Sequence, residues 1–142
     1  MAYEIFEHAA DAGLRVRARD LNGLFRDAAA GLFDLVTDYA ALQKTPEEVL
    51  RTVEMNFREE NAPELFMHWL QELLFFFSAR KLIPVRFDFI TLTPLMLKMK
   101  GKAALFDPRR HVSRHEVKAV THHRFRVFQT PGGWEAEVIL DI

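Results

Sequence analysis

Apolar residues recur at helical spacing between Asp20 and Asp38. The apolar positions are Leu21, Leu24, Phe25, Ala28, Ala29, Leu32, Phe33 and Val36. Residues three and four positions apart lie on one face of an α-helix, and an aspartate side chain can cap its first turn. The pattern therefore predicts a helix that begins after Asp20 and packs one face on a sheet.

A second helical pattern covers residues 61–81, and Asn61 and Glu64 have the spacing of a capping box. Its apolar stripe comprises Leu65, Phe66, Trp69, Leu70, Leu73, Leu74 and Phe77. Phe75 and Phe76 extend the apolar surface beyond one helix face. This width favours burial on more than one side over contact with a partner.

Residues 14–19, "LRVRAR", alternate strictly between apolar and basic side chains. The apolar positions are Leu14, Val16 and Ala18, and the basic positions are Arg15, Arg17 and Arg19. Alternate residues of a strand point to opposite faces, so the segment predicts a strand with one buried face and one face in water.

Further strand-like segments lie before and after the second helix. They are residues 49–57, 85–92, 95–103, 115–129 and 134–142, and a first strand precedes the turn "HAADAG" at residues 8–13. The last two segments flank "TPGG", which is the strongest hairpin signal in the chain. The expected fold is one α+β domain over residues 1–142, with two helices packed on a largely antiparallel sheet in the order β-β-α-β-α-β-β-β-β.

Composition narrows the class of protein. The 142 residues suit one globular domain, and the net charge of −1 gives no sign of an acidic or basic tail. The chain has no cysteine, which excludes disulfides and thiolate sites and agrees with the cytoplasm as the expected compartment. The longest apolar run, "LLFFF", is too short to span a bilayer, and no secretory signal begins the sequence, so no membrane contact is expected.

Familiar catalytic motifs are missing from the sequence. It contains no GxSxG, no phosphate-binding GxxxxGK[ST], no GxGxxG and no HExxH. Classical hydrolase, NTPase and dehydrogenase functions therefore have little support, and the sequence shows no recognisable zinc site. His122 and His123 would point to opposite faces of a strand and could not both bind one metal ion. His68, inside the second helix beside Trp69, is expected to pack or to be half-exposed rather than to act in catalysis.

Two interpretations of the arginine stripe compete. Three arginines on one strand face suit contact with phosphate. Interleaved aromatic residues for base stacking are missing, however, and the net charge is close to zero, which favours a solvated sheet face.

Oxygen donors occur near both ends of the chain. Asp11 lies in the turn close to Gly13, and Asp141 stands beside Ile142, whose α-carboxylate adds a further oxygen donor. Carboxylates gathered in this way suit a hard cation such as calcium or magnesium. Such a site forms only if the first and last strands are neighbours in the sheet.

The sequence as a whole resembles the archease family. The resemblance rests on the segments "HAADAG", "HWLQELLFFF", "FDPRRH", "EVKAVTHH" and the C-terminal "GGWEAEVILDI", which occur from end to end in the family's order and spacing. It implies an accessory protein rather than an enzyme, with no catalytic residues of its own. The implied partner is the RtcB-type RNA ligase, whose guanylylation by GTP and repeated turnover the accessory protein promotes in tRNA splicing, so tRNA would be met only through the ligase.

The resemblance also implies a divalent cation, calcium in most members, with magnesium or manganese as alternatives. Carried over residue by residue, the ligands are Asp11, Asp141 and Ile142, and His8 would support the ligands or face the partner. The family usually has threonine where Ala9 stands, and the missing hydroxyl would weaken the hydrogen bonding near the cation.

Three more residues are candidates for contact with the ligase. Lys118 could meet phosphate or an acidic residue of the partner, or form a salt bridge with Glu116 on the same strand face. Asp107 and His111 lie on a loop, which favours function, although Asp-Pro also starts turns.

Two other functions stay open at this point. One is a chaperone-like module that binds proteins through the surface from Phe75 to Phe77. The other is a stand-alone metal-dependent enzyme acting on a small phosphorylated substrate.

Overall fold

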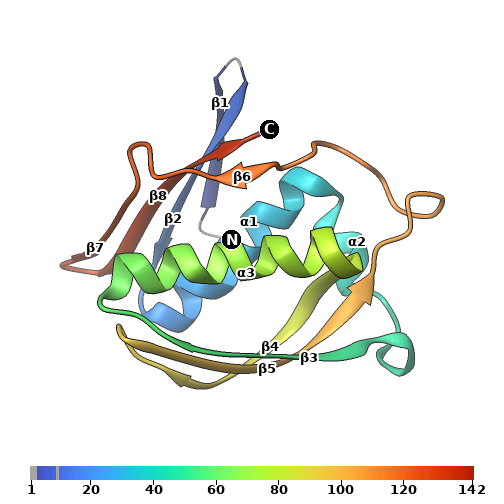
Figure 1. The fold of residues 1–142 in the computed structure, drawn as a ribbon, viewed down its shortest axis with the longest axis horizontal. Helices are drawn as coiled ribbons and strands as arrows, with labels where there is room; N and C mark the ends of the chain where they lie inside the picture. Colours follow the sequence, from blue (N-terminus) through green and yellow to red (C-terminus); the bar gives the residue numbers. More distant parts are fainter. Residues whose placement is uncertain (1–2, 9) are drawn as a thin grey trace.

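Two antiparallel sheets enclose the long helices in the computed structural model, which describes residues 3–8 and 10–142, with the backbone alone at residues 7 and 8 (Figure 1). The first sheet contains β1 (Tyr3–His8), β2 (Asp11–Ala18), β8 (Gly133–Asp141) and β6 (Ala119–Val120) in that order, and β7 (Arg126–Thr130) also pairs with β8. The second sheet has the order β3 (Arg51–Arg58), β5 (Met96–Leu105) and β4 (Leu82–Leu92).

The long helices α1 (Leu21–Val36) and α3 (Ala62–Arg80) form the layer between the sheets. Helix α1 contacts β1, β2 and β8 on one side and β4 on the other, and α3 contacts β6, β7 and β4. A short helix α2 (Tyr39–Gln43) and a 3-10 turn η1 (Glu47–Val49) connect α1 to β3. The α+β class and the antiparallel pairing are thus confirmed, but the strands are divided between two sheets rather than joined in one.

Both predicted helix starts are confirmed. The side chain of Asp20 accepts a hydrogen bond from the backbone N–H of Gly23 at 2.8 Å, and Asn61 accepts from the N–H of Glu64 at 2.9 Å. These carboxylate and amide oxygens satisfy backbone donors that the first turn of a helix leaves unpaired. Helix α3 ends at Lys81, which adopts a left-handed conformation with φ of 58°.

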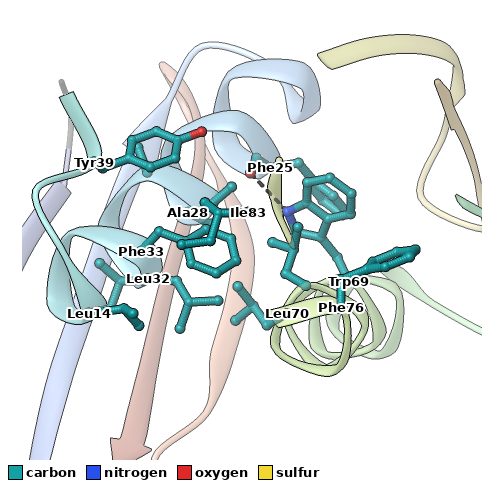
Figure 2. Close-up of a cluster of buried hydrophobic side chains, with 14 of the residues drawn as sticks. Leu14, Phe25, Ala28, Leu32, Phe33, Tyr39, Trp69, Leu70, Phe76 and Ile83 are labelled. Carbon is teal, nitrogen blue, oxygen red and sulfur yellow. Dashed lines mark hydrogen bonds between the residues drawn. The ribbon is translucent and has the colours of Figure 1, made fainter. Parts of the chain in front are cut away.

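The core lies around the contact of the two long helices (Figure 2). Trp69 is fully buried and packs on Phe25, with ring centroids 5.9 Å apart. The hydroxyl of Tyr39 donates to the carbonyl of Pro84 at 2.7 Å, which joins α2 to the second sheet. Phe76 is buried as expected, but Phe75 is 56% exposed, so the prediction of burial was wrong for that residue.

The strand predicted over residues 115–129 is broken. Within this segment, β6 and β7 form strands that pair with β8, and residues 121–125 form a turn between them. The final hairpin is confirmed, with Thr130 paired to Gly133 and a φ of 148° at Gly133 that favours glycine. In the part of the chain that the structure describes, no helix is long and apolar enough to cross a membrane.

Candidate functional site

The two aspartates selected from the sequence are directly paired across the first sheet. In the antiparallel register of β2 and β8, Asp11 is the Cα partner of Asp141. Residues paired in this way project their side chains from the same face of the sheet. The neighbour of β8 is β2, not the first strand β1, so the termini converge through the second strand of the chain.

Asp11 has a buried oxygen without a partner. Among the described residues, no hydrogen-bond donor reaches its Oδ1 atom, although that atom is shielded from solvent. A carboxylate oxygen removed from water is costly unless a donor or a cation compensates it. The residue also lines a hollow of about 280 Å³, together with His123, Arg124 and Ile139. The orphaned oxygen of Asp11 is a group that a bound cation would satisfy, whereas Arg124 is itself cationic and cannot serve as a ligand.

The turn between β6 and β7 places His123 and Arg124 at this hollow. Five residues, 121–125, lie where β8 offers only Val138 and Ile139, so the strand must bulge. Arg124 takes a left-handed φ of 56° within the bulge. The predicted strand through residues 122 and 123 was therefore wrong. Neither His123 nor Arg124 had been selected from the sequence as part of a site.

The bulge is fixed to β8 by Thr121. Its backbone N–H and its hydroxyl both donate to the carbonyl of Ile139, at 3.0 and 2.8 Å. The N–H of Phe125 then closes the turn by donating to the carbonyl of His122 at 3.2 Å. A histidine pair carries no turn signal of its own, and only the pairing of both flanks with β8 reveals the bulge.

Gly13 serves a different purpose from the one expected. The sequence predicts a tight turn at Gly13, but Gly13 lies within β2, opposite Phe6. A Cβ atom at Gly13 would collide with the ring of Phe6, which covers the glycine. A side chain at this position would require the ring of Phe6 to move, because the ring lies close to the strand backbone.

The backbone around Asp141 is held on both sides. Its carbonyl accepts a hydrogen bond from the N–H of Lys118 at 2.7 Å, and the N–H of Ile142 donates to the carbonyl of Ala10 at 3.2 Å. Lys118 is exposed, and within the described part of the chain no ion pair joins it to Glu116. Both residues precede β6 and do not share a strand face.

Side chains alone do not complete a metal centre. No group of three or more histidine, aspartate or glutamate side chains able to hold a metal ion occurs among the described residues. In the expected set, Asp11 and Asp141 supply side chains and Ile142 supplies main-chain oxygen. The backbone of His8 pairs with that of Asp11. The side chain of His8 and the residue Ala9 lie outside the part of the chain that the structure describes, so the expectations about them stay predictions.

Arg15 and Arg17 of the arginine stripe lie on the face of the first sheet that also carries Asp11, and both are paired with acids. Arg17 contacts Glu135 at 2.7 Å, and Arg15 lies 3.5 Å from Glu4 and 3.6 Å from Glu137. Glu137 is only 8% exposed and also accepts a hydrogen bond from Arg126 at 2.9 Å. These ion pairs compensate the charges of Arg15 and Arg17, whereas Arg19, which follows β2, is exposed and forms no ion pair among the described residues.

Asp107 and His111 belong to a separate, well-ordered turn after β5. Asp107 donates its backbone N–H to Nδ1 of His111 at 2.9 Å, and its carbonyl accepts from the N–H of His111 at 2.8 Å. Its Oδ1 accepts from the N–H of Arg109 at 2.9 Å. The turn expected from Asp-Pro is confirmed, and neither side chain lines the hollow beside Asp11.

Comparisons with known proteins indicate the same family along nearly the whole chain. The model of the Archease protein family (MTH1598/TM1083) matches residues 3–142. The protein archease of Methanopyrus kandleri is 37% identical over 145 residues, and the match covers 100% of each chain. The protein archease of Sulfurisphaera tokodaii is 30% identical over 142 residues, and the match covers 99% of this chain and 98% of the relative.

Two solved structures share the fold. The solution structure of Methanobacterium thermoautotrophicum protein 1598 is 28% identical, with a TM-score of 0.75 and 99% of each chain covered. A crystal structure from Thermotoga maritima, described as an archease and possible chaperone, has a TM-score of 0.65 and covers 96% of this chain and 94% of its own. At 16% identity, the latter is a likeness of fold alone.

Proposed function

Because this chain belongs to the archease family, we propose that it is an accessory protein that activates an RtcB-type RNA ligase. Its task would be to promote guanylylation of the ligase by GTP and thereby repeated turnover, with tRNA bound by the ligase alone. The observation that carries the proposal is the cross-strand pairing of Asp11 with Asp141 at an exposed sheet end. The activity would therefore depend on this end of the molecule.

The proposed cation site consists of Asp11, Asp141 and Ile142. The buried and unpartnered Oδ1 of Asp11 supports it, because a bound cation would supply the compensation that hydrogen-bond donors do not. Oxygen ligands favour calcium, with magnesium or manganese as alternatives. When bound, such a cation would supply positive charge to the phosphate groups handled in the ligase active site.

Other residues of the chain would orient this end toward the partner. Arg124 lines the hollow beside Asp11, and its guanidinium is a permanent cation suited to phosphate oxygens. Lys118 has an exposed ammonium group while its backbone is bonded to Asp141, so its position follows that of the aspartate. We assign both residues to binding the ligase or its nucleotide, and neither to a chemical step.

The test combines the purified protein with an RtcB-type ligase from the same source, GTP and manganese, and follows covalent GMP on the ligase over time. Wild-type protein should raise guanylylation to many turnovers, and Asp11→Asn and Asp141→Asn should each reduce the stimulation at least about tenfold, as expected for loss of a charged ligand. Asp88→Asn, at an exposed position on β4 in the other sheet, is the matched control and should stimulate normally.

Two outcomes would contradict the proposal. Full stimulation by folded Asp11→Asn would refute the role of the cation site while leaving activation intact. No stimulation by folded wild-type protein with its matching ligase would refute activation itself.

A chaperone-like module is the second candidate function, and exposed Phe75 is the observation in its favour. This side chain borders a hollow of about 290 Å³ that Leu74, Val117 and Lys118 also line. Suppression of the aggregation of a heat-unfolded protein, lost in Phe75→Ser but kept in Asp11→Asn, would support it. Equal behaviour of the two variants would exclude Phe75 as a docking residue.

A further inference from the structure

We propose that a second site, the basic cavity, binds a free nucleoside diphosphate or triphosphate. The basic cavity lies between α2, η1 and the turn after β5, and its volume is about 440 Å³. The residues that define it here are Lys44, Arg51, Arg110, His111, Val49 and Leu105. Figure 1 shows α2 and the segment that follows β5 on one side of the molecule, apart from the C-terminus.

Three cationic side chains converge on the basic cavity from different elements. Lys44 ends α2, Arg51 begins β3, and Arg110 belongs to the turn after β5. Among the residues that the structure describes, none of the three forms an ion pair with a carboxylate, in contrast to Arg15, Arg17 and others on the first sheet. Like charges gathered without counter-charges favour an anionic ligand.

Of the acids near the basic cavity, Glu47 and Asp107 have partners, whereas Glu48 of η1 is exposed and forms no ion pair among the described residues. Glu47 lies 3.9 Å from Nε of Arg86, on the side of β4. Asp107 is the acid that lines the basic cavity, and its Oδ1 accepts the backbone N–H of Arg109 at 2.9 Å. Three cationic side chains and one carboxylate, that of Asp107, therefore line the basic cavity, which leaves its lining with an excess of positive charge.

His111 adds a donor that the turn has fixed in place. Its Nδ1 accepts the N–H of Asp107, so the neutral ring carries its proton on Nε2. The ring packs on Phe106, with centroids 5.7 Å apart, which restrains its orientation. A preorganised N–H donor beside arginine side chains is typical of a phosphate site.

Part of the lining of the basic cavity is apolar. Val49 is 60% exposed and Leu105 is 44% exposed, and both line the basic cavity. Exposed aliphatic side chains beside cationic ones suit a ligand with a flat apolar part and an anionic part. A nucleoside polyphosphate has both, whereas inorganic phosphate would leave the apolar side chains unused.

This inference does not rest on the proposed function. Neither Asp11 nor Asp141 lines the basic cavity, and no residue of the basic cavity lines the hollow beside Asp11. The ligand of the basic cavity would bind without a divalent cation, because side-chain cations supply the positive charge. A test in the presence of a chelator therefore separates the two sites.

The test is a titration of the isotope-labelled protein with ADP, adenosine or pyrophosphate in EDTA, followed by the amide signals in two-dimensional NMR spectra. ADP should shift signals within residues 44–51 and 105–111. Arg51→Gln and Arg110→Gln should each weaken ADP binding about tenfold, the effect of losing one charge-assisted hydrogen bond. Pyrophosphate should bind more weakly than ADP, and adenosine more weakly still.

The matched controls are Arg58→Gln, at the other exposed end of β3, and Arg109→Gln, the neighbour of Arg110 in the same turn. Neither side chain lines the basic cavity, and both variants should bind ADP like wild type. All four variants alter exposed positions, and the amide spectrum itself verifies that they fold.

Four results would overturn the inference. The first is that millimolar ADP shifts no amide signals, and the second is that the shifts are confined to the end of the first sheet where β2 pairs with β8. The third is that adenosine or pyrophosphate binds as tightly as ADP. The fourth is that the control substitutions weaken ADP binding as much as Arg51→Gln and Arg110→Gln do. A short RNA with a 5′-phosphate that binds the basic cavity more tightly than ADP would overturn the assignment to a free nucleotide.

Discussion

The indole N–H of Trp69 donates to the backbone carbonyl of Phe25 at 2.9 Å, and this bond connects α3 to α1 between the two sheets (Figure 2). Trp69 is fully buried, so no water molecule can replace a lost partner. Trp69→Phe removes the donor and leaves unfilled volume. We expect the free energy of unfolding in urea to fall by about 2–4 kcal/mol.

Trp134→Phe is the control for that substitution. Trp134 is half-buried on β8, and its indole ring makes no hydrogen bond within the described part of the chain. Its replacement should cost less than half as much free energy. Equal losses for the two variants would show that ring volume, and not the link between the helices, sets the effect.

Calcium should stabilise the folded protein through the proposed cation site. A ligand at about 100 times its Kd adds about 2.7 kcal/mol to the free energy of unfolding, so Tm should rise by several degrees and return on addition of EDTA. Asp11→Asn and Asp141→Asn should abolish the shift, while Asp88→Asn keeps it. Differential scanning calorimetry would measure all four proteins, and an unchanged shift in Asp11→Asn would contradict the ligand assignment.

Without calcium, Asp11→Asn should be at least as stable as wild type. The substitution removes the charge of a carboxylate whose Oδ1 is buried without a donor. Chemical denaturation in EDTA tests this directly. A marked loss of stability would mean that the charge of Asp11 is already compensated in the folded protein.

Alkaline titration should reveal the environment of Tyr3. Burial, followed by the hydrogen bond to Asp34 and the negative charge of that residue, raises the pKa of Tyr3 from 10.0 to about 12. Burial also raises the pKa of Tyr39, the other tyrosine of the chain. Ultraviolet absorbance should therefore show no tyrosinate near pH 10 in the folded protein and a full step there in urea.

The free energy of unfolding should depend on pH through the same rise in the pKa of Tyr3. Because Tyr3 holds its proton more tightly when folded, its contribution is complete below pH 10 and is lost as the pH rises to about 12. Tyr3→Phe should flatten this loss in urea denaturation measured across that range. An identical pH dependence in Tyr3→Phe would assign the loss to other groups.

Glu137 should matter more for stability than the exposed arginines around it. Glu137→Ala leaves Arg15 and Arg126 facing each other without the buried carboxylate, and we expect a loss of about 1–3 kcal/mol in the free energy of unfolding. Arg17 has a side chain that is 62% exposed, so Arg17→Ala should cost less than about 1 kcal/mol. Similar costs in urea denaturation would contradict a role for burial.

Local patterns determined the helices, the alternating strand and the last hairpin. The caps of Asp20 and Asn61 act within their own first turns, and the alternation of residues 14–19 needs only the two-residue period of a strand. The same local chemistry selected Asp11 and Asp141 as oxygen donors. These features follow from the sequence because each depends on neighbours a few residues away.

Tertiary structure alone decided how the strands divide and which distant side chains meet. The strand register pairs Asp11 with Asp141, and the bulge brings Arg124 to the same hollow. Lys44 and Arg110 line one cavity. Each of these arrangements joins residues that lie far apart in the chain. Helix α3 has apolar residues on more than one side, so a second sheet must cover it, but no local period specifies which strands do so. Such contacts are set by packing of the whole core, and a short window of sequence does not contain that information.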